Sequence, residues 1–262
     1  MPQPATKKTS DKKRSKFRFP SLSKAPIQEA VIDFQIKPFG PDVLSSLEAL
    51  HEQTKEAFPI KEPLARVEAS MSIHAEQGVH DIGGKSERVG ILCRSASGNE
   101  VVQFRRDGFA YSLLKPYSDW GSFVQKAKEL WDKYKKTLPE ARISRLGVRN
   151  INILELPPPG TKLTEYFHPL LSIPKDLPKT VRQLFTRVEL PFDNDIRAAV
   201  VQAFPTGDPV KPSYLIDIDT FRVFPEPGLR EEDPWATINE FRLVKNRIFF
   251  AIISKKTERL LK

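Results

Sequence analysis

Cysteine and histidine, which supply most thiol and metal sites, are scarce in this sequence. Cys93 is the single cysteine among 262 residues, so no disulfide can form within the chain. No cysteine cluster or second histidine pair completes a zinc ligand set around the four histidines, which are His51, His74, His80 and His168. We therefore expect no metal centre, and we expect Cys93, in the strand-like run 89–93, to be a buried structural thiol.

Long hydrophobic runs are also missing. No apolar stretch approaches the roughly 18 residues that a membrane-spanning helix requires. Residues 1–6 have none of the apolar character of a secretory signal. These absences, with the single cysteine, favour a cytoplasmic protein without a membrane span.

The net charge of +9 is concentrated in one short segment. Residues 1–18 carry a net +6, which leaves only +3 for the rest of the chain. We expect residues 1–24 to be a disordered basic tail, because the segment has few apolar residues to offset the entropy of ordering. The tail could contact the phosphates of nucleic acid or of acidic lipid through Lys7, Lys8, Lys12, Lys13, Arg14, Lys16 and Arg18.

What the sequence does contain is a clear hairpin followed by an amphipathic helix. Apolar residues alternate on both sides of Asp107-Gly108, which is a strong hairpin signal. After it, apolar residues recur at helical spacing from Trp120 to Leu138, behind Ser118 as a plausible N-cap. An antiparallel hairpin that leads into a helix indicates an α+β fold.

The same patterns divide the rest of the chain. Strands are expected at about 27–36, 64–73, 89–94, 101–104, 141–156, 183–191, 196–205 and 212–224. Further helices are expected to begin at Pro41 and to run from about 235 to 261, with a polar loop over 75–87. We predict antiparallel sheets covered by three amphipathic helices. The domains are an N-terminal half over 25–160 and a C-terminal half over 161–262, which ends in a long helix; the similar order of their elements leaves an internal repeat open.

A glycine-bearing segment, Asp81 to Ser86, resembles a phosphate-binding loop at first sight. That motif needs a glycine five positions before Gly84, and residue 79 is valine. It also needs a helix after the loop, whereas the residues from Val89 onward read as a strand. We therefore reject a nucleotide site here.

Two segments contain candidate polar residues. Asp217 and Asp219 lie two residues apart in a strand, so both belong to one face of it. Together they could hold Mg²⁺ beside a phosphate substrate, or they could pair with nearby arginines. The strand around residues 145–152 places Asn150 and Asn152 on the face opposite to that of Arg145 and Arg149, in a polar pocket or a structural hydrogen-bond network. The candidate polar site is Arg145, Arg149, Asn150, Asn152, Asp217 and Asp219.

Several short segments recur together in the order of a known pattern: residues 25–30, 102–109, 116–120, 145–152, 217–219, 245–250 and 253–257. Over residues 25–262 the chain resembles a sporadically distributed prokaryotic family of uncharacterised proteins. The resemblance implies a bacterial or archaeal cytosolic protein with an accessory role, such as phage defence or a toxin–antitoxin module. It supplies no activity, cofactor or catalytic residue, and it does not include the basic tail.

Two functions remain open on the sequence alone. The lack of a catalytic constellation or cofactor motif favours a non-enzymatic protein-binding protein. One version is chaperone-like, since strands followed by a long helix resemble, in order only, the SecB-type export chaperones. The alternative is a metal-dependent nucleic-acid-processing enzyme that uses Asp217 and Asp219. A third carboxylate or a histidine within reach of these aspartates favours the enzyme, whereas an exposed apolar groove favours the binder.

Overall fold

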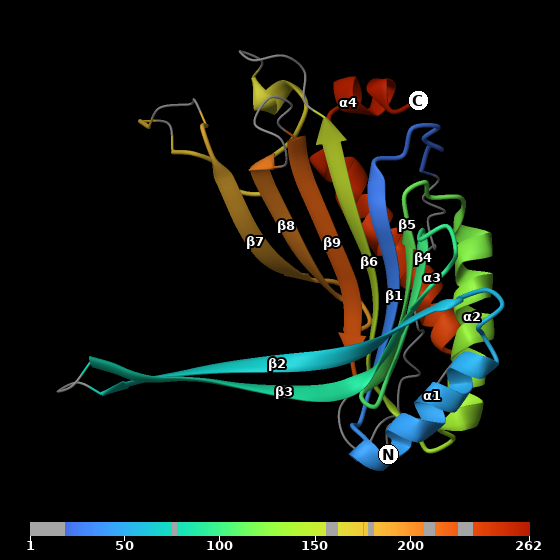
Figure 1. Ribbon diagram of the computed structural model, residues 1–262. Coiled ribbons are helices and arrows are strands. Elements are labelled where there is room, and N and C mark those ends of the chain that lie inside the picture. The colour runs from blue at the N-terminus through green and yellow to red at the C-terminus, as the bar shows by residue number, and fades with distance from the viewer. Residues whose placement is uncertain are drawn as a thin grey trace, which may run out of the picture.

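The fold is known from a computed structural model. The residues that it describes are 19–74, 78–155, 162–174, 176–177, 181–206, 213–224 and 233–262. For residues 68–74, 78–85 and 205–206 it describes the backbone only. The described strands form one antiparallel sheet of nine, in the order β2-β3-β4-β5-β1-β6-β9-β8-β7 (Figure 1). The strands are β1 (Ile27–Ile36), β2 (Ile60–His74), β3 (Gly78–Arg94), β4 (Glu100–Arg105), β5 (Gly108–Leu114), β6 (Ile143–Glu155), β7 (Leu184–Pro191), β8 (Arg197–Thr206) and β9 (Ser213–Val223).

The α+β class is confirmed, but the strands form a single sheet where the sequence predicted several. Strand β1 is the reason, because it pairs with β5 on one edge and with β6 on the other. Strand β6 in turn pairs with β9, which joins the strands of the C-terminal half to the same sheet. Both neighbours pair with β1 over most of its length, and the alternating residues Ala30, Ile32, Phe34 and Ile36 are all buried.

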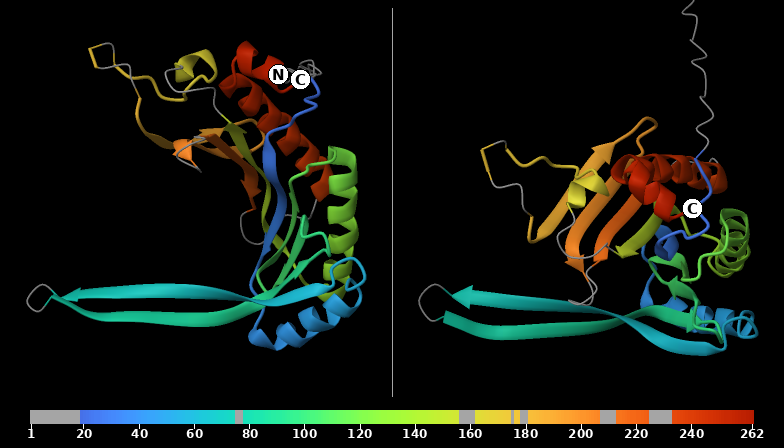
Figure 2. Two further views of the ribbon diagram at one scale, coloured as in Figure 1. Left: turned by 45° about the horizontal axis from the view of Figure 1, so that its top comes forward. Right: turned by 90° about the horizontal axis from the view of Figure 1, so that it is seen from above.

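Helices lie against one face of this sheet (Figure 2). They are α1 (Leu44–Glu52), α2 (Trp120–Thr137), α3 (Pro234–Ile252) and α4 (Lys255–Leu260), with short 3₁₀ turns η1 (Pro41–Val43) and η2 (Leu163–Glu165). The apolar face predicted for α2 is confirmed, since Trp131 is buried and its ring stacks on that of Phe34 with centroids 4.1 Å apart. Cys93 is buried as expected, and this burial raises the pKa of its thiol to about 11.

Two details of the helices differ from the prediction. The N-cap of α2 is Asp119 rather than Ser118, because the Asp119 carboxylate accepts a hydrogen bond from the backbone N–H of Ser122. The last helix was predicted to be continuous, but it divides into α3 and α4. Ile253 is extended and forms a β-bridge with Phe167, and the Ser254 hydroxyl then accepts hydrogen bonds from the first backbone N–H groups of α4.

The predicted loop over 75–87 is wrong for residues 78–87, which belong to β3. From Ala65 to His74, β2 pairs with the part of β3 between Gly78 and Arg88, with one register shift between Ser72 and Ile73. Strand β4 pairs with β3 only from Gly90 to Arg94. The ribbon of residues 65–74 and 78–88, called the arm below, therefore projects from the body of the sheet (Figures 1 and 2).

Residues 19–24, which the sequence assigned to the tail, contact the C-terminal helices. The Phe19 ring stacks on Phe250, with centroids 5.4 Å apart. The backbone N–H of Lys24 donates to the carbonyl of Leu261 at 3.0 Å, and Leu22 packs against the core beneath α3. The remaining tail residues, 1–18, lie outside the described residues.

Candidate functional site

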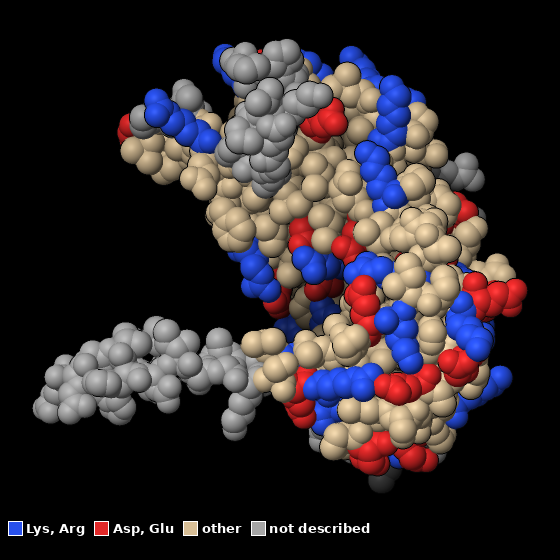
Figure 3. Space-filling model, viewed as in Figure 1, with Lys and Arg blue, Asp and Glu red and all other residues tan. Residues whose placement is uncertain are grey.

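The face of the sheet opposite to the helices, called the open face below, holds a row of alternating charges. On each strand the residues between the buried apolar ones point to this side. Asp33 comes from β1, Arg145 and Arg149 from β6, and Asp217 and Asp219 from β9. Figure 3 shows acidic and basic side chains gathered where the surface is hollowed, between the base of the arm and the strands.

Asp217 is held by one arginine through two hydrogen bonds. Arg149 donates from Nε to Oδ1 of Asp217 at 2.8 Å and from Nη2 to Oδ2 at 2.6 Å. This two-point geometry matches the planar guanidinium to the carboxylate and is the strongest form of such a pair. The hydrogen bond with Asp217 raises the pKa of Arg149.

Asp219 shares a second arginine with another strand. Arg145 donates from Nη2 to Asp219 at 2.7 Å and from Nη1 to Asp33 at 3.4 Å. Asp33 also accepts from Arg105 at 2.7 Å, and Arg105 lies 3.5 Å from Asp107 in the β4–β5 turn. Counted from the base of the arm, the charge row is Arg66, Asp107, Arg105, Asp33, Arg145, Asp219, Arg149 and Asp217.

Burial affects one carboxylate of this row, that of Asp219. It raises the pKa of Asp219, although the charge and hydrogen bond of Arg145 act in the opposite direction. Desolvation therefore outweighs the attraction of the arginine at this carboxylate. The row holds four acidic and four basic residues, so its carboxylates are compensated in charge rather than left as an acidic cluster.

An aromatic ring and a glycine shape the same part of the face. Two guanidinium groups lie near the ring of Phe221: the centroid of the ring is 4.3 Å from Cζ of Arg145 and 4.9 Å from Cζ of Arg197. A Cβ atom at Gly147 would come within 2.9 Å of Nη1 of Arg145. Glycine at this strand position thus leaves room for the arginine that joins Asp33 to Asp219.

The two asparagines of the predicted site lie on the other face, beneath the helices. Asn152 donates to the carbonyl of Ile216 at 3.0 Å and to that of Asn150 at 3.3 Å. The Oδ1 atom of Asn150 is buried and has no hydrogen-bond partner within the described residues. Lys245 of α3 is also buried on this side of the sheet. The six predicted residues are therefore divided between the two faces, as the strand alternation indicated, and do not form one site.

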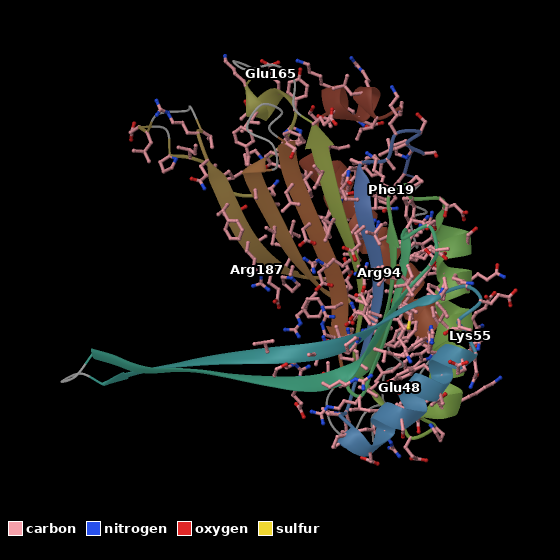
Figure 4. The ribbon with its side chains drawn as sticks, viewed as in Figure 1. Phe19, Glu48, Lys55, Arg94, Glu165 and Arg187 are labelled. Atoms are coloured by element: carbon pink, nitrogen blue, oxygen red, sulfur yellow. The ribbon has the colours of Figure 1, made fainter. Side chains whose placement is uncertain are left out.

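At the β7 end of the open face, two prominent side chains are exposed. Phe185 is 72% exposed, and Arg187 lies on the same strand face two residues later (Figure 4). No ion pair or hydrogen bond of Arg187 is found within the described part of the chain. Glu189, the next residue on this face, accepts from Arg197 at 3.1 Å.

Sequence reasoning missed five members of this arrangement, namely Asp33, Arg66, Arg105, Asp107 and Phe221. Asp33 alternates with the buried residues of β1, and Arg105 directly precedes the hairpin turn, so each was visible as a charge in a strand. The periodicity of one strand says which face a residue takes but not which strand lies next to it. The pairing of β1 with β6, which brings Asp33 to Arg145, is therefore the information that the sequence lacks.

Among the described residues, no group of three or more histidine, cysteine, aspartate or glutamate side chains could hold a metal ion. None of their helices combines the length and the apolar character needed to cross a membrane. No protein-family model matches the chain, and no curated protein matches it in sequence. The function is therefore inferred from geometry.

Proposed function

We propose that this is a non-enzymatic protein-binding protein that uses the open face. The observation that supports this most is the contrast between the two ends of that face. The aspartates near its centre are already engaged by arginines, while Phe185 and Arg187 at the β7 end are exposed. Aromatic and arginine side chains are the residues most enriched at protein interfaces and at their hot spots.

The pairing of the aspartates with arginines also argues against the metal-dependent enzyme. Asp33 is a third carboxylate near Asp219, which is the feature that would favour a metal-dependent enzyme. However, Arg145 lies between the two, and Arg149 occupies both oxygens of Asp217. A hard divalent cation would have to displace these guanidinium groups before it reached the oxygens.

A chaperone-like mode of binding fits the connectivity of the sheet. We propose that the chain consists of two related halves that divide between α2 and β6 rather than at residue 160, since each half then begins with a strand that pairs with its own last strand. These pairs are β1 with β5 and β6 with β9, and a long helix follows each last strand. The open face would then extend across both halves and offer a long surface to an unfolded or extended polypeptide.

The wider setting is proposed on the sequence alone. The resemblance over residues 25–262 suggests an accessory protein of the prokaryotic cytoplasm, in defence or in a toxin–antitoxin module. The basic residues of the tail, which lie outside the described residues, would add a contact to nucleic acid.

Site-specific photo-crosslinking in cells tests the binding surface. A photoreactive amino acid at position 187 should give covalent adducts with a polypeptide other than this chain. The same amino acid at Leu243, which is 49% exposed on α3, is the matched control and should give few. Equal labelling at both positions would contradict the assignment of the open face.

Titration with Mg²⁺ or Mn²⁺ tests the alternative separately. We expect no saturable heat and no rise in the melting temperature, because both aspartates are paired with arginine. A metal-dependent rise that disappears in Asp217→Asn would favour the metal-dependent enzyme instead.

A further inference from the structure

The sheet ends in an unpaired strand on both sides within the described residues. Strand β2 pairs only with β3, and strand β7 pairs only with β8. The outer edges of such strands present unpaired backbone N–H and C=O groups, which readily accept another strand. Both edges lie on the same side of the molecule, because the arm projects past the end of the sheet where β7 lies (Figures 1 and 2).

Within the described residues the arm also lacks a third strand that would stabilise it. A two-stranded ribbon is at best marginally stable in water, and the described arm residues have no third strand beside them. Its register places Met71 opposite Ile82 and Ile73 opposite Val79, so apolar residues occupy paired positions on one face. Val67 belongs to the same alternating set on β2 and is 70% exposed.

Strand β7 offers a surface of the matching kind. Its residues Leu184, Val188 and Leu190 are half-buried and extend the core beneath α3 toward the edge of the sheet. Its other face holds Arg187 followed by Glu189. A strand added at this edge would therefore need apolar residues on one side and, on the other, an acidic residue followed by a basic one in antiparallel order.

We propose that two copies of this chain exchange arms, so that β2 of each copy pairs antiparallel with β7 of the other. A single register satisfies the whole of β7. It places Glu68 opposite Arg187 and Arg66 opposite Glu189 on one face. On the other face the same register gives apolar pairs, namely Val67 with Val188 and Met71 with Leu184.

Charge complementarity selects this occupant over an arbitrary peptide. The order of signs along β7 is basic then acidic, and β2 read in the antiparallel direction is acidic then basic. Arg66 and Glu189 also have partners in their own chain, Asp107 and Arg197. Arg187 has no such partner within the described residues, so its pairing with Glu68 is the contact that the variants below test. Reciprocal exchange closes the assembly at two copies, whereas one-way addition would continue into a chain of molecules.

Analytical ultracentrifugation of the full-length chain tests the exchange. The protein should sediment as a dimer of its 29.8 kDa chain. Arg187→Glu and Glu68→Arg should each weaken the dimer by about tenfold or more, since each places like charges in both contacts. An equimolar mixture of the two variants should regain the wild-type affinity, because both of its contacts again join opposite charges.

Substitution of exposed apolar residues by aspartate gives a second test of the dimer. Val67→Asp should abolish the dimer, and Leu260→Asp, at a residue 58% exposed on α4, is the matched control and should not. Circular dichroism should show both variants folded, since both positions are exposed. A monomer at every concentration, a mass that grows without limit, or weakening by the arm variants but not by Arg187→Glu would each overturn the proposal. These outcomes can be told apart from those of the partner-binding test. Crosslinks from position 187 to a second copy of this chain support the exchange, whereas crosslinks to a different polypeptide support the partner-binding proposal.

Discussion

At the scale of single residues, Lys245 is an amine buried between α3 and the sheet. Its Nζ donates to Oδ1 of Asn246 at 3.0 Å, and Arg242 is a charged neighbour. Burial is the main cause that lowers the pKa of Lys245 to about 7, and the positive charge of Arg242 adds to it. The folded protein therefore pays for holding this charge away from water whenever the amine is protonated.

This cost predicts a pH-dependent effect of Lys245→Met. Because the pKa in the folded state lies below that in the unfolded state, the unfolded chain binds more protons between about pH 7 and 10.5, and stability rises with pH over that window. At pH 6 the methionine variant should be more stable than the wild type by roughly 3–5 kcal/mol, and the difference should fall by about half near pH 9. Urea unfolding at several pH values measures this; a difference that is the same at pH 6 and pH 9 would refute it.

Arg145 is the residue on which the charge row most depends, since it joins Asp219 to Asp33. Arg145→Met should lower the free energy of unfolding at pH 7 by about 1–3 kcal/mol, less than for a fully buried pair because these side chains keep some solvent contact. Burial already raises the pKa of Asp219, so the loss should shrink as acid protonates this carboxylate.

The control for Arg145→Met is Arg94→Met. Arg94 lies 3.9 Å from Glu62 in an exposed pair, so its loss should change stability by less than about 1 kcal/mol. Equal effects of the two substitutions would show that the row on the open face has no special energetic role.

At the scale of elements, the N-cap of α2 can be tested by comparing Asp119 with its neighbour Ser118. The Asp119 carboxylate accepts from both the backbone N–H and the hydroxyl of Ser122, at 3.0 and 2.7 Å. Asp119→Ala should therefore cost about 1 kcal/mol of stability, whereas Ser118→Ala should cost much less. Thermal unfolding of the two variants measures the difference, and the reverse ranking would restore Ser118 as the cap.

The elements that sequence predicted well are those whose signal is local. Strand β1 has the predicted bounds because its alternation is uninterrupted. The predicted hairpin is also confirmed, although its two turn residues are Arg106 and Asp107, and Gly108 already pairs with Arg105 as the first residue of β5. The failures depend on distant partners. Residues 78–87 read as a loop because the segment is polar and rich in glycine, yet they are held extended by pairing with β2. The break before Ser254 follows from a bridge to Phe167, far away in sequence.

At the scale of the whole molecule, the candidate site shows the same division. The faces of Arg145, Arg149, Asp217 and Asp219 follow from alternation within their own strands. Their partners do not, because the order of strands determines that Asp33 meets Arg145 and that Phe221 lies beside Arg197. The central place of β1, the first strand in sequence, is set by long-range pairing that no local pattern encodes.

The contacts of residues 19–24 with the C-terminal helices predict different effects for two truncations of the N-terminus. Removing residues 1–16 should leave the thermal midpoint nearly unchanged, since that segment has few apolar residues to offset its ordering. Removing residues 1–24 should lower the midpoint, because it deletes the stack of Phe19 on Phe250, the packing of Leu22 and the hydrogen bond from Lys24 to Leu261. Differential scanning calorimetry of the two truncations measures this. Equal midpoints would show that residues 19–24 contribute nothing, and a large loss on removing 1–16 would show that the tail is part of the fold.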